Sequence, residues 1–195
     1  MLFFDKAVDR QILGLEFPSS ALLSLGPLFV LICSPLLVLF SERVLEKGKP
    51  LNGLIKIGIG FILTSLSFGI LAFSCHVHSD LISPVWVVGS ILIQTLGELL
   101  IVPIGFSNIS KLAPPRLRSL MMSFWLMAIA YGHYFGGMIA QGSVNPSPLQ
   151  ETALMHYHAF FLNLALMPCL VGIGLFCTRI LTLFCAPIFK KQYNS

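Results

Sequence analysis

Five long stretches of this chain are almost entirely apolar, and each is long enough to cross a lipid bilayer. A hydrocarbon core about 30 Å thick requires roughly 20 helical residues, because each residue adds about 1.5 Å. Inside lipid the backbone must satisfy its own hydrogen bonds, and these stretches are too long and too uniformly apolar to be alternating barrel strands. They therefore predict five transmembrane helices, over residues 17–40, 57–75, 84–110, 119–140 and 159–183.

The composition agrees with a chain that folds in lipid. Hydrophobic residues make up 56% of the sequence and charged residues only 10%, whereas a soluble domain has about 25% charged residues. We therefore expect residues 1–195 to form a single all-α domain, a polytopic membrane bundle of about five helices. The formal net charge of +4 does not indicate nucleic-acid binding, because the Lys and Arg residues cluster between the apolar segments, where they set membrane orientation.

The distribution of Lys and Arg predicts the topology, since short loops that carry positive charge stay in the cytoplasm. Positive clusters follow the first, third and fifth apolar segments, in residues 43–56, 111–118 and 190–191. The connections 75–83 and 141–158 contain no Lys or Arg and fit the opposite side. We expect an external N-terminal segment, an external Asn145 and a cytoplasmic C-terminus; only Lys6 and Arg10 disagree with this orientation.

Prolines and small residues inside the apolar segments indicate a packed bundle. Each proline removes a backbone hydrogen bond, which membrane helices tolerate where neighbouring helices or polar groups take up the freed carbonyl. The prolines in question are Pro27, Pro35, Pro103 and Pro168. Small residues spaced by four, Gly60 with Thr64 and Gly132 with Gly136, offer faces on which a neighbouring helix can approach closely.

Glu98 is the only acidic residue inside any of the five apolar segments, and it lies near the middle of residues 84–110. A charged side chain at that depth costs on the order of 3 kcal/mol by insertion scales, so such residues normally face a bundle interior or an aqueous cavity and carry function. Glu98 is therefore a candidate for holding a proton or pairing with a substrate cation. The alternative is a protonated carboxyl that hydrogen-bonds a neighbouring helix.

Three further polar or aromatic side chains are candidates for the same site. Gln94 lies one helical turn before Glu98 and shares its face, although an amide can equally join two helices. Trp125 either lines a cavity or belongs to the aromatic belt at the membrane interface. His133, eight residues further on, could relay protons, but a single membrane histidine is more often structural.

The cysteines and the paired histidines do not predict a metal centre. The five cysteines form no CxxC pair and fit packing roles. His76 with His78 and His156 with His158 form two H-x-H pairs, which we place in external loops without supporting carboxylate or cysteine ligands. The chain also has no nucleophile motif, phosphate-binding glycine-rich loop or paired catalytic carboxylates, so we expect neither a cofactor nor an enzyme.

A motif series that begins at Gly97 resembles the tenth and eleventh helices of the proton-dependent oligopeptide transporters. The matching residues, at the family's spacing, are Gly97, Glu98, Leu99, Pro103, Gly105, Ser107, Lys111, Leu112, Ala113, Pro114, Met121, Met122 and Trp125. The N-terminal stretch FFDKAVDRQILGLEFPSSALLSLGPLFV also resembles the family segment before its eighth helix. The likeness covers almost the whole chain, in register with helices eight to twelve.

The resemblance implies part of a major facilitator fold, in which two six-helix halves enclose a site at the bilayer midplane. It implies small peptides as the substrate, an inward proton gradient as the driving force and a bacterial inner membrane as the location. Glu98 would engage the ammonium group of the peptide, and Trp125 would line the pocket near it. Gln94, on the Glu98 face, completes the set of expected substrate-binding residues.

Two positions depart from the family pattern. Leu25, Gly26 and Pro27 stand where the family has Leu-Asn-Pro, so one substrate contact is missing, and Ser123 stands where a glycine is frequent. The sequence also lacks the first seven helices and their Glu-x-x-Glu-Arg region. We expect a truncated part of a peptide:proton symporter that does not transport alone. One hypothesis is that it works by joining a separately encoded N-terminal half. The alternative is a non-transporting membrane remnant or an interaction subunit.

Overall fold

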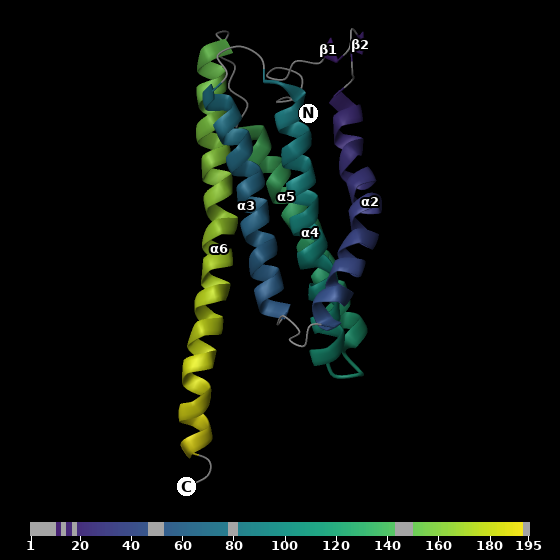
Figure 1. The fold of residues 1–195 in the computed structure, drawn as a ribbon, viewed down its shortest axis with the longest axis vertical. Coiled ribbons are helices and arrows are strands. Elements are labelled where there is room, and N and C mark those ends of the chain that lie inside the picture. The colour runs from purple at the N-terminus through teal and green to yellow at the C-terminus, as the bar shows by residue number, and fades with distance from the viewer. Residues whose placement is uncertain are drawn as a thin grey trace.

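The computed structural model describes residues 11–12, 15–16, 19–46, 53–77, 82–142 and 150–192, with side chains for 24–39, 53–77, 82–141 and 155–179. Within these ranges the chain is helical apart from the connections 82–83 and 113–117 and two short strands, β1 (Gln11–Ile12) and β2 (Leu15–Glu16), which pair antiparallel. The helices are α2 (Ser19–Glu46), α3 (Gly53–Val77), α4 (Pro84–Leu112), α5 (Arg118–Gly142) and α6 (Gln150–Gln192). Figure 1 shows them as long rods that run up and down the molecule.

The all-α fold class predicted from the apolar segments is confirmed. Each of the five segments lies almost entirely within one helix, and α2 and α6 extend well beyond theirs. By length and composition, the described residues contain three helices able to cross a membrane, Gly53–Val77, Pro84–Leu112 and Met155–Arg179. The part of α2 with described side chains, Ser24–Leu39, is a shorter apolar helix. Helix α5 carries several polar groups. Membrane crossing by α2 and α5, and the exact limits of every span, stay predictions.

Proline shapes the ends of α4 and is tolerated inside the helices. Pro84 occupies the first turn of α4, where no backbone donor is needed. Ala113 leaves the helix with an extended backbone just before Pro114, as residues before proline usually do. A tight turn, in which the Leu117 amide donates to the Pro114 carbonyl at 2.9 Å, then leads into α5. The prolines predicted to lie inside helices do so in α2, α4 and α6.

Helix α3 packs closely against α4 at a pair of glycines. A Cβ atom on Gly97 of α4 would lie 2.8 Å from the carbonyl oxygen of Gly60 and 2.8 Å from Oγ1 of Thr64 in α3. The predicted close approach at Gly60 and Thr64 is therefore confirmed. Gly132 and Gly136 of α5 differ, because a Cβ on either would meet no atom within 4 Å. The described α5 touches the bundle near its start and stands away from it at these glycines.

The buried core lies where α3 ends, α4 begins and α6 passes both. Its apolar members are Leu71, Ala72, Cys75, Ile82, Val87, Tyr157 and Phe161. Serine hydroxyls join the same three helices, since Ser67 donates to the Ser90 carbonyl at 2.8 Å and Ser65 to the Ala165 carbonyl at 2.7 Å. Large apolar side chains such as Leu31 and Met167 are exposed on the outside. This surface suits lipid, where interior packing relies on small and hydroxyl residues.

The histidines occupy helices where the sequence suggested loops. His76 lies in the last turn of α3, and His156 and His158 lie inside α6, which already begins at Gln150. The prediction of loop positions for these three is wrong, because the stretch from Gln150 contains good helix formers and no glycine or proline before Pro168. His78 and Asn145 lie outside the described residues.

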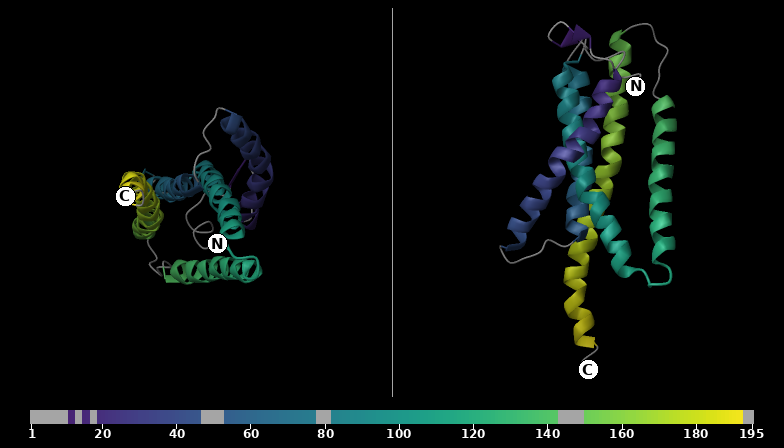
Figure 2. Two further views of the ribbon diagram at one scale, coloured as in Figure 1. Left: turned by 90° about the horizontal axis from the view of Figure 1, so that it is seen from below. Right: turned by 90° about the vertical axis from the view of Figure 1, so that its right-hand side faces the viewer.

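The helices are arranged as a row with one helix standing across it. Seen end-on, α6, α3 and α4 follow one another, α2 lies beyond α4, and α5 lies across the open side (Figure 2). The side view in Figure 2 shows that α4 and α5 meet next to their short connection and diverge toward the other end. This divergence leaves one face of α4 and one face of α5 uncovered by the described chain.

Candidate functional site

The polar pair predicted on α4 is formed. Nε2 of Gln94 donates a hydrogen bond of 3.2 Å to Oε1 of Glu98, as the one-turn spacing of the two residues allows. Gln94 is half-buried, whereas Glu98 is exposed on the described bundle. The amide therefore orients one carboxylate oxygen and leaves the other available for a cation or a proton.

Trp125 of α5 packs its indole onto α4 at a position that has no side chain. A Cβ atom on Gly105 would collide with Cζ2 of the indole and lie 2.6 Å from Cη2. The ring of Phe106 meets the indole edge-on, with 6.2 Å between ring centroids. Sequence reasoning noted Gly105 only as a motif match and missed Phe106. The sequence signal for this contact is Gly105 itself. A glycine weakens a helix interior, so its presence there indicates close packing with a neighbouring group.

The Nε1 group of Trp125 is buried and has no hydrogen-bond partner among the described residues. A buried donor without a partner costs about 1–3 kcal/mol, so native structures nearly always satisfy it. Because the chain itself covers this N–H, the group lies inside the contact between α4 and α5.

Glu98 and Trp125 lie along the same side of α4 without touching. Glu98 and Gly105 are seven residues apart, which is two helical turns, so they share a face of α4. At a rise of about 1.5 Å per residue, the carboxylate stands roughly 10 Å along the helix from the point where the indole rests. The structure thus brings the predicted site residues to one face, with Gln94 and Glu98 in contact and Trp125 further along.

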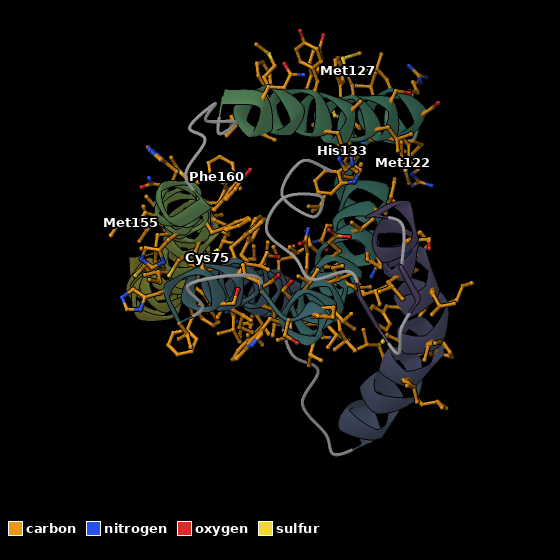
Figure 3. All side chains as sticks on the ribbon, turned by 90° about the horizontal axis from the view of Figure 1, so that it is seen from above. Cys75, Met122, Met127, His133, Met155 and Phe160 are labelled. Carbon is orange, nitrogen blue, oxygen red and sulfur yellow. The ribbon has the colours of Figure 1, made fainter. Side chains whose placement is uncertain are left out.

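The facing side of α5 carries two more side chains that point toward α4. Figure 3 shows Met122 and His133 on the side of α5 that faces the rest of the bundle, and Met127 on the opposite side. His133 therefore lies on the same general face as Trp125, as the sequence predicted, and it is exposed there. Gly26 of α2 presents no side chain, and a Cβ atom built on it would meet nothing within 4 Å.

A helical bundle with three helices long and apolar enough to cross a bilayer, and with large apolar side chains on its outside, has the character of an integral membrane protein. The family model described as the POT family matches residues 1–155 of this chain. The chain therefore belongs to the POT family, the proton-dependent oligopeptide transporters that its motif series resembles.

Known relatives agree with this assignment. The chain is 28% identical over its whole length to the peptide transporter YePEPT of Yersinia enterocolitica, of which it spans 36%. It is 28% identical to the dipeptide and tripeptide permease A of Salmonella typhimurium, over 97% of this chain and 37% of the permease. An uncharacterized transporter of Bacillus subtilis, YclF, is 35% identical over 71% of this chain and 28% of its own length. The chain thus spans between 28% and 37% of the length of these proteins.

Solved structures show the same fold. A crystal structure of the peptide transporter POT with sulfate matches 95% of this chain and 34% of its own, with a TM-score of 0.75 and 24% identity. A POT family transporter in complex with 5-aminolevulinic acid matches 90% of this chain and 35% of its own, with a TM-score of 0.75 and 23% identity. The predicted partial transporter fold is confirmed at the level of helix arrangement.

Proposed function

We propose that this chain forms part of a proton-coupled symporter for di- and tripeptides and that Glu98, Gln94 and Trp125 line its substrate site. The observation that carries the proposal is the exposed Glu98 carboxylate, held by Gln94 on the α4 face that also receives Trp125. A carboxylate at mid-depth must be covered by protein or water rather than lipid. The peptide substrates in the names of the relatives supply the chemistry of the ligand.

The spacing of the site suits a short peptide. An extended chain spans about 3.3–3.6 Å per residue, so the roughly 10 Å between the level of Glu98 and the level of Trp125 accommodates a dipeptide or tripeptide. A carboxylate opposite the peptide ammonium gains far more in a low-dielectric cavity than in water. The indole of Trp125, packed on α4 at Gly105, borders the other end of this face.

The site requires protein that these residues do not supply. The uncovered faces of α4 and α5 offer one wall of a cavity, and secondary transporters place the substrate between two helical repeats. The remaining wall comes from helices outside this sequence, either in the same polypeptide or in a separate one. These 195 residues by themselves accordingly bind lipid but do not accumulate peptide.

The test measures uptake of a labelled dipeptide into vesicles with an inward proton gradient. The chain alone should give no uptake, and the chain together with the first seven helices of a matching transporter should restore it. In that assembly Glu98→Gln should reduce uptake on the order of 100-fold, because the peptide ammonium loses its buried partner. Glu46→Gln, at the end of α2 and away from the site, is the matched control and should leave uptake unchanged.

A peptide with an acetylated N-terminus separates the two roles open to Glu98. It has no ammonium to lose, so its slower uptake should respond much less to Glu98→Gln. Equal loss for free and acetylated peptides would assign Glu98 to proton transfer instead. Failure of the assembly to take up any peptide, with both parts present in the membrane, would favour a non-transporting membrane protein.

A further inference from the structure

Two histidines from distant parts of the chain face each other at one end of the bundle. His76 lies in the last turn of α3 and His158 lies in α6, and their ring centroids are 5.4 Å apart with a tilt of 53° between the planes. Helices α3 and α6 run side by side in both Figure 1 and Figure 2. Neither residue belongs to the α4 and α5 faces that carry the proposed peptide site.

A hydrogen bond fixes the ring of His158 and its tautomer. Nδ1 of His158 lies 2.8 Å from the carbonyl oxygen of Ala72. A carbonyl oxygen only accepts, so Nδ1 carries the proton and donates, and Nε2 of the neutral ring keeps its lone pair. Ala72 lies one turn before His76, so this bond holds the His158 ring beside the His76 ring. Metal-binding histidines are typically oriented in this way, through the nitrogen that does not bind the metal.

We propose that His76 and His158 bind one divalent transition-metal ion, with Zn²⁺ and Cu²⁺ as the best matches to imidazole ligands. Two imidazoles that share a tetrahedral ion at bonds of roughly 2.1 Å place their ring centres roughly 5 Å apart, close to the observed separation. His158 is half-buried and His76 is exposed, so the ion remains open to solvent on one side. Water molecules complete its coordination, and the ion joins the end of α3 to α6.

Among the residues that the structure describes, the groups near the two rings offer no third protein ligand. Cys75 precedes His76 but is buried in the apolar core with Tyr157, so its thiol is directed elsewhere. His156 is exposed and stands about 200° around α6 from His158, on the other side of the helix. The described residues contain no group of three or more His, Cys, Asp or Glu side chains that could hold a metal.

The test titrates Zn²⁺ into the metal-free chain in detergent by calorimetry and records the Cu²⁺ electron paramagnetic resonance spectrum. The wild-type chain should bind one equivalent of Zn²⁺, and its Cu²⁺ spectrum should show coupling to two imidazole nitrogens. His76→Gln and His158→Gln should each weaken Zn²⁺ binding at least ~10-fold and reduce the coupling to one nitrogen. His156→Gln and His133→Gln are matched controls and should bind as the wild type does.

Footprinting of the unaltered chain gives a second measurement that does not depend on variant folding. Diethylpyrocarbonate should modify His76 more slowly when Zn²⁺ is present, while modification of His156 should not change. The proposal is overturned if His158→Gln binds Zn²⁺ as tightly as the wild type, or if Zn²⁺ leaves His76 unprotected. Loss of binding in His76→Gln but not in His158→Gln would place the ion on His76 with His78 and would equally overturn the two-helix site.

Discussion

At the scale of single residues, the candidate site includes a glycine, Gly105, whose lack of a side chain lets Trp125 pack on α4. Gly105 leaves the space on α4 that the indole of Trp125 fills, and Phe106 borders it. Gly97, next to Glu98 in the same motif, leaves the space in which α3 approaches α4. The two glycines therefore serve packing, while the neighbouring Glu98 and Gln94 supply the polar chemistry.

The role of Gly105 is tested by Gly105→Ala. A glycine in a helix interior normally gains about 0.8–1.0 kcal/mol of stability when alanine replaces it. Here the new methyl group collides with the indole, and overpacking costs about 1–3 kcal/mol, so the thermal stability of the purified chain should fall. In a Trp86→Phe background, the fluorescence of Trp125 should also shift to longer wavelength as the ring is displaced.

Gly89→Ala is the matched control for this change. Gly89 lies in the same helix, and a Cβ atom built on it meets nothing within 4 Å. Its substitution should therefore keep or raise the stability and leave the Trp125 spectrum unchanged. Similar effects of the two alanines would contradict the contact between α4 and α5.

At the scale of helices, α3 is the central element because it packs against both α4 and α6. Its contact with α4 uses glycines and a threonine, and its contacts through serine hydroxyls reach Ser90 in α4 and Ala165 in α6. Since lipid is as apolar as leucine, close backbone approach and hydrogen bonds have to supply the helix association. On the described part of α5, a Cβ atom at Gly132, Gly136 or Gly137 would meet nothing within 4 Å, in keeping with its separation from the row.

The close approach of α3 and α4 predicts the effect of Gly97→Ala. The added methyl group would lie 2.8 Å from the Gly60 carbonyl oxygen, which is backbone and cannot rotate away. We expect the two helices to separate and the thermal stability to fall by about 1–3 kcal/mol. Gly69→Ala in α3, where a Cβ meets no atom, is the control and should be neutral or stabilising. Equal stability of the two variants would show that Gly97 is not at a helix contact.

At the scale of the whole molecule, the distribution of charge predicts how the bundle sits in the membrane. Reporter fusions should place a site after Lys191 in the cytoplasm and a site near Asn145 outside, since the connection between α5 and α6 contains no Lys or Arg. A cytoplasmic signal from the fusion near Asn145 would mean that α5 or an earlier helix does not cross the bilayer. This fusion bears most directly on α5, which is less apolar than the candidate spans in α3, α4 and α6.

The sequence by itself determined which segments are helical, that the chain belongs in a membrane, and that Glu98 and Gln94 share a face. These properties are local, because a helix satisfies its own backbone through bonds four residues apart and its residence in lipid follows from hydropathy. The motif series around Glu98 also pointed to the POT family, which the family model then showed.

Only the tertiary structure decided which helix faces meet. Gly60 and Thr64 contact α4, whereas Gly132 and Gly136, with the same small-residue spacing, contact nothing described. Trp125 contacts Gly105 of the preceding helix. His158 contacts His76, and it also bonds the carbonyl of Ala72, which lies 86 residues earlier in the sequence. Such pairings depend on the positions of whole helices relative to one another, and the energy that selects them is spread over many contacts that no single segment contains.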